Sequence, residues 1–90
     1  MATLLVGYDL HRPRANYEAL EAKLRNLGAW WHHLDSTWFV RTEMTPVQLR
    51  DELKTLIDEK DQLLVIDVSG RAAAWYGFAE RGSQWMKQWL

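Results

Sequence analysis

The amino-acid sequence predicts an α+β domain built on a four-stranded antiparallel sheet. Two stretches carry apolar residues at helical spacing, and four others are rich in β-branched, aromatic and aliphatic residues. These stretches alternate along 90 residues, which is the length of a single domain. We therefore expect one domain over residues 1–90, with a core over 3–78 and a C-terminal strand or helix extension over 79–90.

Composition and charge exclude several classes of protein. The net charge of −1 lacks the basic excess of proteins that bind nucleic acid by bulk electrostatics, so phosphate contact would need a local cluster. The chain has no cysteine, which excludes disulfides and thiolate metal sites. The longest apolar stretches are far shorter than the ~20 residues of a membrane span, and no basic signal-peptide region is present. We expect a cytoplasmic protein, and dimerisation is an ordinary way for so small a chain to bury more surface.

The first expected strand covers residues 3–9. Apolar side chains occur on both of its faces, which indicates a central strand. Pro13 disfavours helix in the loop that follows. The next helix is expected to begin after Asn16, a good N-cap, and to end at Gly28.

The middle of the chain predicts two strands and a second helix. An aromatic and β-branched stretch is too long for one strand, so we divide it into strands over 29–35 and 37–42. Thr45, Pro46 and Gln48 form the clearest local signal, because a threonine cap, a proline in the first helical turn and a glutamine three residues after the cap are typical of a capping box.

The last third predicts a buried strand over 62–68, followed by either a short strand or irregular chain over 72–78. Ser83 is expected to cap a final short helix. The resulting β-α-β-β-α-β order is the split βαβ, or ferredoxin-like, arrangement, with two helices on one face of the sheet and an added C-terminal segment. A dimer partner or a ligand is the expected cover for the other face.

Three short segments carry a resemblance to a known family. They are Gly-Tyr-Asp-Leu at 7–10, Trp-His-His-Leu-Asp-Ser-Thr-Trp at 31–38, and the segment 67–75. Together with the element order, they resemble the Cas-two family of small CRISPR-associated adaptation proteins and its VapD-type toxin relatives. The resemblance is closer to the SinR-like set of bacterial and phage proteins.

This resemblance implies a ferredoxin-like homodimer, in some members a metal-dependent nuclease. The family's metal-binding aspartate ends the first strand, and Asp9 matches that position. The family's hydroxyl residue near the break of the second strand corresponds to Ser36 or Thr37. The Ser-Val-Phe-Glu pattern of the Cas-two type is replaced here by Thr-Trp-Phe-Val at 37–40.

Asp9 has two interpretations from the residues themselves. Mg²⁺ prefers oxygen ligands and uses one or two protein carboxylates, and a two-fold interface would bring two copies of Asp9 into one site. A metal there would activate water and neutralise charge on a phosphodiester. Alternatively, Asp9 accepts backbone N–H bonds in a turn, as aspartates at strand ends often do.

A basic loop follows Asp9 directly. The planar guanidinium groups of Arg12 and Arg14 suit phosphate, and His11 can donate or accept a proton near neutral pH. Tyr8 precedes Asp9 in the same matched motif. The alternative is that the loop is a solvated, charged surface.

Tryptophans and histidines in the strand pair offer further candidates. Trp38 or Trp31 is the favoured residue for stacking a nucleobase, although most of the six tryptophans are expected in the core or in a dimer interface. His32 and His33 are adjacent on an expected strand and point to opposite faces, which disfavours a zinc site.

Two functional hypotheses follow. In the first, a homodimer binds RNA, DNA or nucleotide phosphates and is a Mg²⁺-dependent endonuclease through paired Asp9, with His11 as a second catalytic residue. In the second, the dimer is a non-catalytic adaptor or sequestering module, for example in phage–host conflict, that holds a nucleotide or a protein partner.

Overall fold

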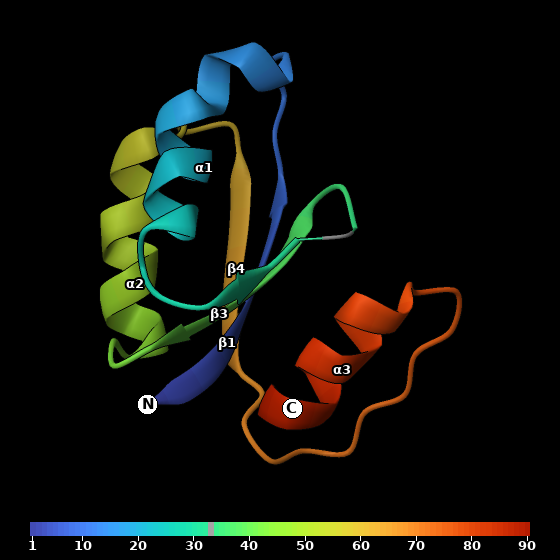
Figure 1. Ribbon diagram of the computed structural model, residues 1–90. Helices are drawn as coiled ribbons and strands as arrows, with labels where there is room; N and C mark the ends of the chain where they lie inside the picture. Colours follow the sequence, from blue (N-terminus) through green and yellow to red (C-terminus); the bar gives the residue numbers. More distant parts are fainter. Residues whose placement is uncertain (33) are drawn as a thin grey trace.

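The computed structural model describes residues 1–32 and 34–90, without the side chains of Arg14 and Ala15. It has an α+β architecture in which helices lie on both sides of one antiparallel sheet (Figure 1). No helix in the described part of the chain has the length and apolar character needed to cross a membrane. The strands are β1 (Ala2–Asp9), β2 (Trp30–Trp31), β3 (Thr37–Thr42) and β4 (Gln62–Asp67), the helices are α1 (Glu18–Arg25), α2 (Pro46–Leu53) and α3 (Glu80–Trp89), and the 3₁₀ turns are η1 (Arg14–Tyr17) and η2 (Lys54–Leu56).

The strand order in the sheet is β2-β3-β1-β4, with every neighbouring pair antiparallel. β1 lies between β3 and β4, as its two apolar faces predicted. In register, Val6 faces Trp38 on one side and Val65 on the other. The four-stranded antiparallel sheet is compatible with a ferredoxin-like fold.

One face of the sheet packs against α1 and α2 and forms the main core (Figure 1). Its side chains come from alternate positions of β1 and β3, because successive residues of a strand point to opposite faces. Burial of each large aliphatic side chain contributes about 1.5–3 kcal/mol, so this layer accounts for much of the stability of the fold. The cluster consists of Leu4, Val6, Tyr17, Leu20, Leu24, Trp38, Val40, Leu49 and Leu53.

The start of α2 confirms the predicted capping box. The Thr45 hydroxyl accepts a hydrogen bond from the Gln48 backbone N–H at 3.1 Å, and the Gln48 side-chain oxygen accepts one from the Thr45 N–H at 2.9 Å. Pro46 occupies the first helical position. Two N–H groups that a helix leaves without internal partners are therefore satisfied locally.

The other face of the sheet is covered in part by α3 (Figure 1). The guanidinium of Arg41 lies 4.4 Å from the ring centroid of Trp89. Gly82 allows the close approach of α3, because a Cβ there would lie 2.4 Å from a ring atom of Trp31. The final helix was predicted, but it begins at Glu80 rather than near Ser83.

The strand predicted over 29–35 is shortened to Trp30–Trp31. The chain leaves the sheet after Trp31 because a turn forms between β2 and β3. In this turn the Nε2–H of His32 donates to the Asp35 carbonyl at 3.1 Å, and the Thr37 N–H donates to the Leu34 carbonyl at 3.2 Å. The strand predicted over 37–42 is confirmed as Thr37–Thr42.

Three further sequence-based expectations are corrected. β4 was predicted as a buried strand, but it lies at the edge of the sheet and leaves Leu64 and Ile66 56% and 42% exposed. Asn16 does not cap α1, because the 3₁₀ turn η1 precedes that helix and places Tyr17 at its cap position. Residues 72–78 are irregular chain rather than a strand.

Candidate functional site

A polar pocket of about 370 Å³ lies where β1 ends, between α1 and the turn that connects β2 to β3. Four residues predicted from the sequence as site residues line it: Tyr8, Asp9, Arg12 and Ser36. They come from the end of β1, the loop after it and the turn before β3, so the fold gathers chain segments that are far apart in sequence. The remaining lining residues are Leu10, Tyr17, Leu20, Glu21, His32 and Asp35.

The ionisable groups of this pocket are mainly acidic. Asp9 and Asp35 are exposed, whereas Glu21 is only 8% exposed and lies 3.6 Å from the guanidinium of Arg25. Among the described side chains, Arg12 is the one arginine that lines the pocket, and its pairing with the Asp58 carboxylate raises the pKa of Arg12. An acidic pocket of this kind attracts cations and disfavours a bare phosphate.

Trp38 is not the open stacking surface expected from the sequence. It is only 1% exposed, and its Nε1–H donates to the Tyr8 hydroxyl at 2.9 Å. The His32 ring stacks on the Trp38 ring with the ring centroids 3.9 Å apart and the planes 17° apart. The side chain is buried because Trp38 faces Val6 in the sheet register, on the side covered by α1 and α2.

The remaining predicted residues of this region differ in role. The Ser36 carbonyl accepts the Tyr8 N–H at 3.1 Å and so fixes the turn against β1. Thr37 begins β3 opposite Gly7 and is not part of the pocket lining. Arg14 belongs to η1, but its side chain and residue His33 lie outside what the structure describes.

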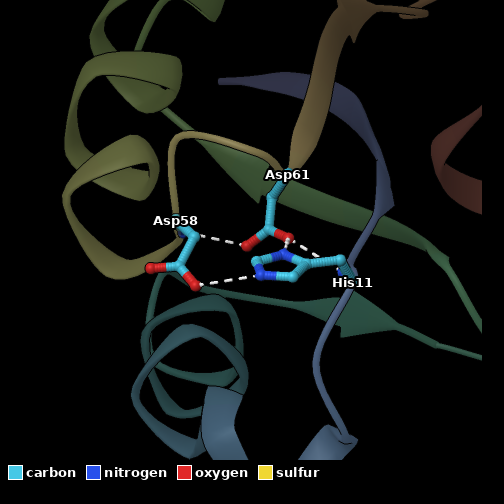
Figure 2. Close-up of side chains that lie close together, drawn as sticks. All are labelled: His11, Asp58 and Asp61. Atoms are coloured by element: carbon cyan, nitrogen blue, oxygen red, sulfur yellow. Dashed lines mark hydrogen bonds and ion pairs between the residues drawn. The ribbon is translucent and has the colours of Figure 1, made fainter.

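A second polar cluster lies beside the pocket and is centred on Asp61 (Figure 2). Its carboxylate accepts hydrogen bonds from His11 Nδ1 at 2.5 Å, the His11 backbone N–H at 2.9 Å, the Tyr17 hydroxyl at 2.9 Å and the Asp58 backbone N–H at 2.8 Å. The Asp61 side chain has no exposed surface. These bonds join the loop after β1 to the turn before β4.

The hydrogen bonds determine the ionisation of Asp61. Burial of the carboxylate acts to raise its pKa, but the bonds from His11, Asp58 and Tyr17 outweigh burial and hold the pKa of Asp61 well below its usual range. The pKa of Tyr17 is raised, first by burial and then by its bond to Asp61. Asp61 is therefore a charged anchor at neutral pH.

The Asp61 carboxylate also orients the His11 ring. With Nδ1 held by Asp61, the ring directs Nε2 toward Asp58, at 3.4 Å from its Oδ2 atom (Figure 2). The side chain of His11 remains 37% exposed. An imidazole held through one nitrogen by a carboxylate is suited to proton transfer at the other nitrogen.

The same three side chains could hold a metal ion, since ligand atoms of His11, Asp58 and Asp61 lie within 4.8 Å of one another. A mixed nitrogen and oxygen donor set is not specific for Mg²⁺, which prefers oxygen ligands. Four hydrogen bonds already satisfy Asp61, so in the described arrangement this cluster acts as a clasp between two loops.

Sequence reasoning missed Asp35, Asp58 and Asp61 as members of these sites. Asp58 and Asp61 close a turn, with the Asp61 N–H donating to the Asp58 carbonyl at 3.0 Å, and a pair of aspartates with this spacing is a signal for such a turn. Their partner His11 lies 50 residues from Asp61 in sequence, so no local pattern could have indicated the contact.

Comparison with known proteins gives no relative. No protein-family model, no curated protein and no solved structure matches the chain. The functional assignment therefore depends on the geometry described above.

Proposed function

We propose that this chain forms a ferredoxin-like homodimer that binds the phosphate groups of RNA, DNA or a nucleotide through a divalent cation held at Asp9. The strand order β2-β3-β1-β4 supports the fold, because it is the order that a βαββαβ chain adopts when each crossover skips one strand. The small size of the chain and its exposed Leu64 and Ile66 support a second copy as partner. We also propose that the chain belongs to the Cas-two and SinR-like group.

The observation that carries this proposal is the convergence of Asp9, Asp35, Arg12 and Ser36 on one pocket. A single aspartate is a weak cation site, but the pocket adds the exposed carboxylate of Asp35 from the same chain. Carboxylate oxygens are the ligands that Mg²⁺ prefers. The acidic lining also explains how a chain with net charge −1 can contact phosphate, since a bound cation would reverse the local charge.

The ionisable residues of the pocket and of the neighbouring cluster would have separate roles in the proposed reaction. Asp9 and Asp35 would hold the cation, which would neutralise phosphate charge and activate water for attack. Arg12 lies between this pocket and the cluster centred on Asp61, where it would contact a second phosphate oxygen. His11 lines the neighbouring cluster rather than this pocket, and its Nε2 faces Asp58, so it would exchange a proton with a substrate that extends from the pocket past Arg12.

A specific observation favours the non-catalytic alternative. His11 and Arg12 are both engaged by Asp58, so the basic loop is partly neutralised within the chain itself. In this alternative the pocket binds a nucleotide or a protein partner without cleavage, as an adaptor or sequestering module. Binding and cleavage must therefore be measured separately.

The test uses the whole chain and Mn²⁺ as the metal probe. Calorimetric titration compares wild type with Asp9→Asn and Asp35→Asn, and Glu43→Gln serves as the control because Glu43 is an exposed carboxylate that follows β3 at the opposite end of the sheet. We expect each pocket variant to weaken Mn²⁺ binding about tenfold, which corresponds to about 1.4 kcal/mol. The control should bind as the wild type does.

Cleavage is assayed in parallel on single- and double-stranded RNA and DNA, with His11→Gln added to the series. Mn²⁺-dependent cleavage that is lost in Asp9→Asn and in His11→Gln supports the enzyme. Cation-dependent binding of nucleic acid without cleavage supports the module. Absence of any Mn²⁺ site at Asp9, or a monomer by light scattering, contradicts the proposal.

A further inference from the structure

A second pocket, of about 330 Å³, lies on the other face of the sheet. Its walls are the sheet, the irregular segment that leads to α3, and α3 itself. The volume falls within the range of small-molecule sites, about 300–1,000 Å³. The lining residues are Leu5, Leu34, Phe39, Val68, Arg71, Ala72, Ala73, Ala74, Trp75, Phe78, Met86 and Leu90.

The short side chains of the segment 72–74 keep this pocket open. Three successive alanines place little volume against the sheet, where larger side chains would fill the space. The segment is also held in place, because the Nε1–H of Trp75 donates to the Ser83 hydroxyl at 3.0 Å. The pocket opens to solvent and its lining is almost entirely apolar, so it favours an apolar ligand with a polar group at the opening.

Arg71 supplies the charge that selects among apolar ligands. It is the one ionisable side chain among the described residues that line the pocket, and it is exposed to solvent. Among the described residues it forms no salt bridge. Hydrogen bonds from Ser69 and, to a lesser degree, the charge of Arg71 lower the pKa of Asp67. Arg71 and Asp67 form no ion pair, so the guanidinium can pair with a carboxylate at the mouth of the pocket.

We infer that this pocket binds a small carboxylate with an apolar body, of the class of medium-chain fatty acids. The tail lies among Leu5, Phe39 and Trp75, and the carboxylate pairs with Arg71. The site is separate from Asp9, since the two pockets share no lining residue and lie on opposite faces of the sheet. Binding at this pocket can therefore be tested independently of the function proposed for Asp9.

The test titrates the whole chain with decanoate below its micelle concentration and follows backbone amide shifts by NMR. Decylammonium, with the same tail and opposite charge, and decanol, with no charge, are the ligand controls. The variants are Arg71→Gln, which removes the charge, and Ala73→Leu, which reduces the free volume. The control variant is Arg81→Gln, because Arg81 is an exposed arginine on α3 outside the lining.

We expect saturable binding of one decanoate per chain, with shifts confined to the segment 71–78, α3 and the facing strands. Arg71→Gln should weaken decanoate about two- to fivefold, as expected for an exposed ion pair, and leave decanol unchanged. Ala73→Leu should weaken both ligands, whereas Arg81→Gln should weaken neither.

Several results would overturn the inference. Decylammonium binding as tightly as decanoate, or decanoate binding that ignores Arg71→Gln, would remove the role of the arginine. Conversion of a dimer to a monomer by Ala73→Leu would show that a second copy occupies the pocket instead. Thermal unfolding by circular dichroism verifies folding of each variant, and Arg71→Gln tests the inference even where Ala73→Leu does not fold.

Discussion

The two faces of the sheet differ in how completely they are packed. On the face covered by α1 and α2, the nine residues of the core cluster are each at most 3% exposed. The face covered by α3 leaves Leu64 and Ile66 exposed, contains a pocket, and buries the Nε atom of Arg41 without a hydrogen-bond partner among the described residues. One face thus supplies most of the stability, and the other retains room for a ligand or a partner.

The largest effect should come from the packed face. Leu49 is fully buried between α2 and the sheet, so Leu49→Ala should lower the free energy of unfolding by about 2–5 kcal/mol, through lost burial and the cavity left behind. Chemical denaturation measures this. The matched control is Leu64→Ala on the other face, which should change stability by less than about 0.5 kcal/mol. Equal losses for the two variants would break the comparison between the faces.

A smaller effect is expected where α3 meets the sheet. Gly82→Val should destabilise by about 1–3 kcal/mol, because the added side chain would overlap the ring of Trp31. Hydrogen exchange should show faster exchange in α3 while α2 keeps its protection. Gln88→Val places the same residue at an exposed position of α3 and should have little effect on exchange. Loss of protection in both helices would mean that the two faces unfold as one unit.

The contribution of the capping box at the start of α2 to stability can be measured directly. Thr45→Ala removes the acceptor for the Gln48 N–H and should cost about 1 kcal/mol, measured by thermal unfolding. Thr55→Ala, at an exposed threonine beyond the helix, removes only a solvent-exposed hydrogen bond from its hydroxyl to the Glu52 carbonyl and should cost less than about 0.5 kcal/mol. An equal cost at the two positions would show that the capping box adds no stability.

The smallest effect on stability is expected only at acid pH, and it concerns the hydrogen bonds to Asp61. Because the pKa of Asp61 is lowered in the folded state, the folded chain binds fewer protons than the unfolded chain below about pH 4. This contribution to stability is therefore complete above the ordinary aspartate pKa of 3.8 and is lost as the pH falls toward the lower folded value. Stability measured between pH 4 and pH 2 should decline less steeply in Asp61→Asn than in wild type.

Asp51→Asn is the control for this pH series, since Asp51 is an exposed carboxylate on α2. Its stability should decline with acid in parallel with that of wild type. If Asp61→Asn also ran parallel to wild type, the hydrogen bonds to Asp61 would not be the cause of the acid sensitivity.

Local signals in the sequence predicted local structure well. The cap at Thr45, the central position of β1 and the strand Thr37–Thr42 all depend on residues close in sequence, and all three are confirmed. The exposure of β4 could not be predicted in this way. Its run of apolar residues is equally compatible with a buried strand, and only the order of strands places it at an edge.

The candidate site was predictable only where its residues lie close together in sequence. Asp9 is the last residue of β1 and Arg12 lies three residues later, so their proximity to each other is a local property. The burial of Trp38 depends on its register against Val6, and the clasp depends on a contact between His11 and Asp61 across 50 residues. Such pairings are set by the tertiary fold rather than by spacing along one chain.

The outer edge of β4 has a consequence for how two copies could share a cation. If two chains paired antiparallel along this edge over all six residues, Gln62 would face the partner's Asp67. Asp9 lies beside Gln62 within its own sheet, so the Cα atoms of the two Asp9 residues would end about 22 Å apart, given ~3.3 Å per residue and ~4.8 Å between strands. An extended eight-stranded sheet is thus incompatible with one ion bridging both aspartates.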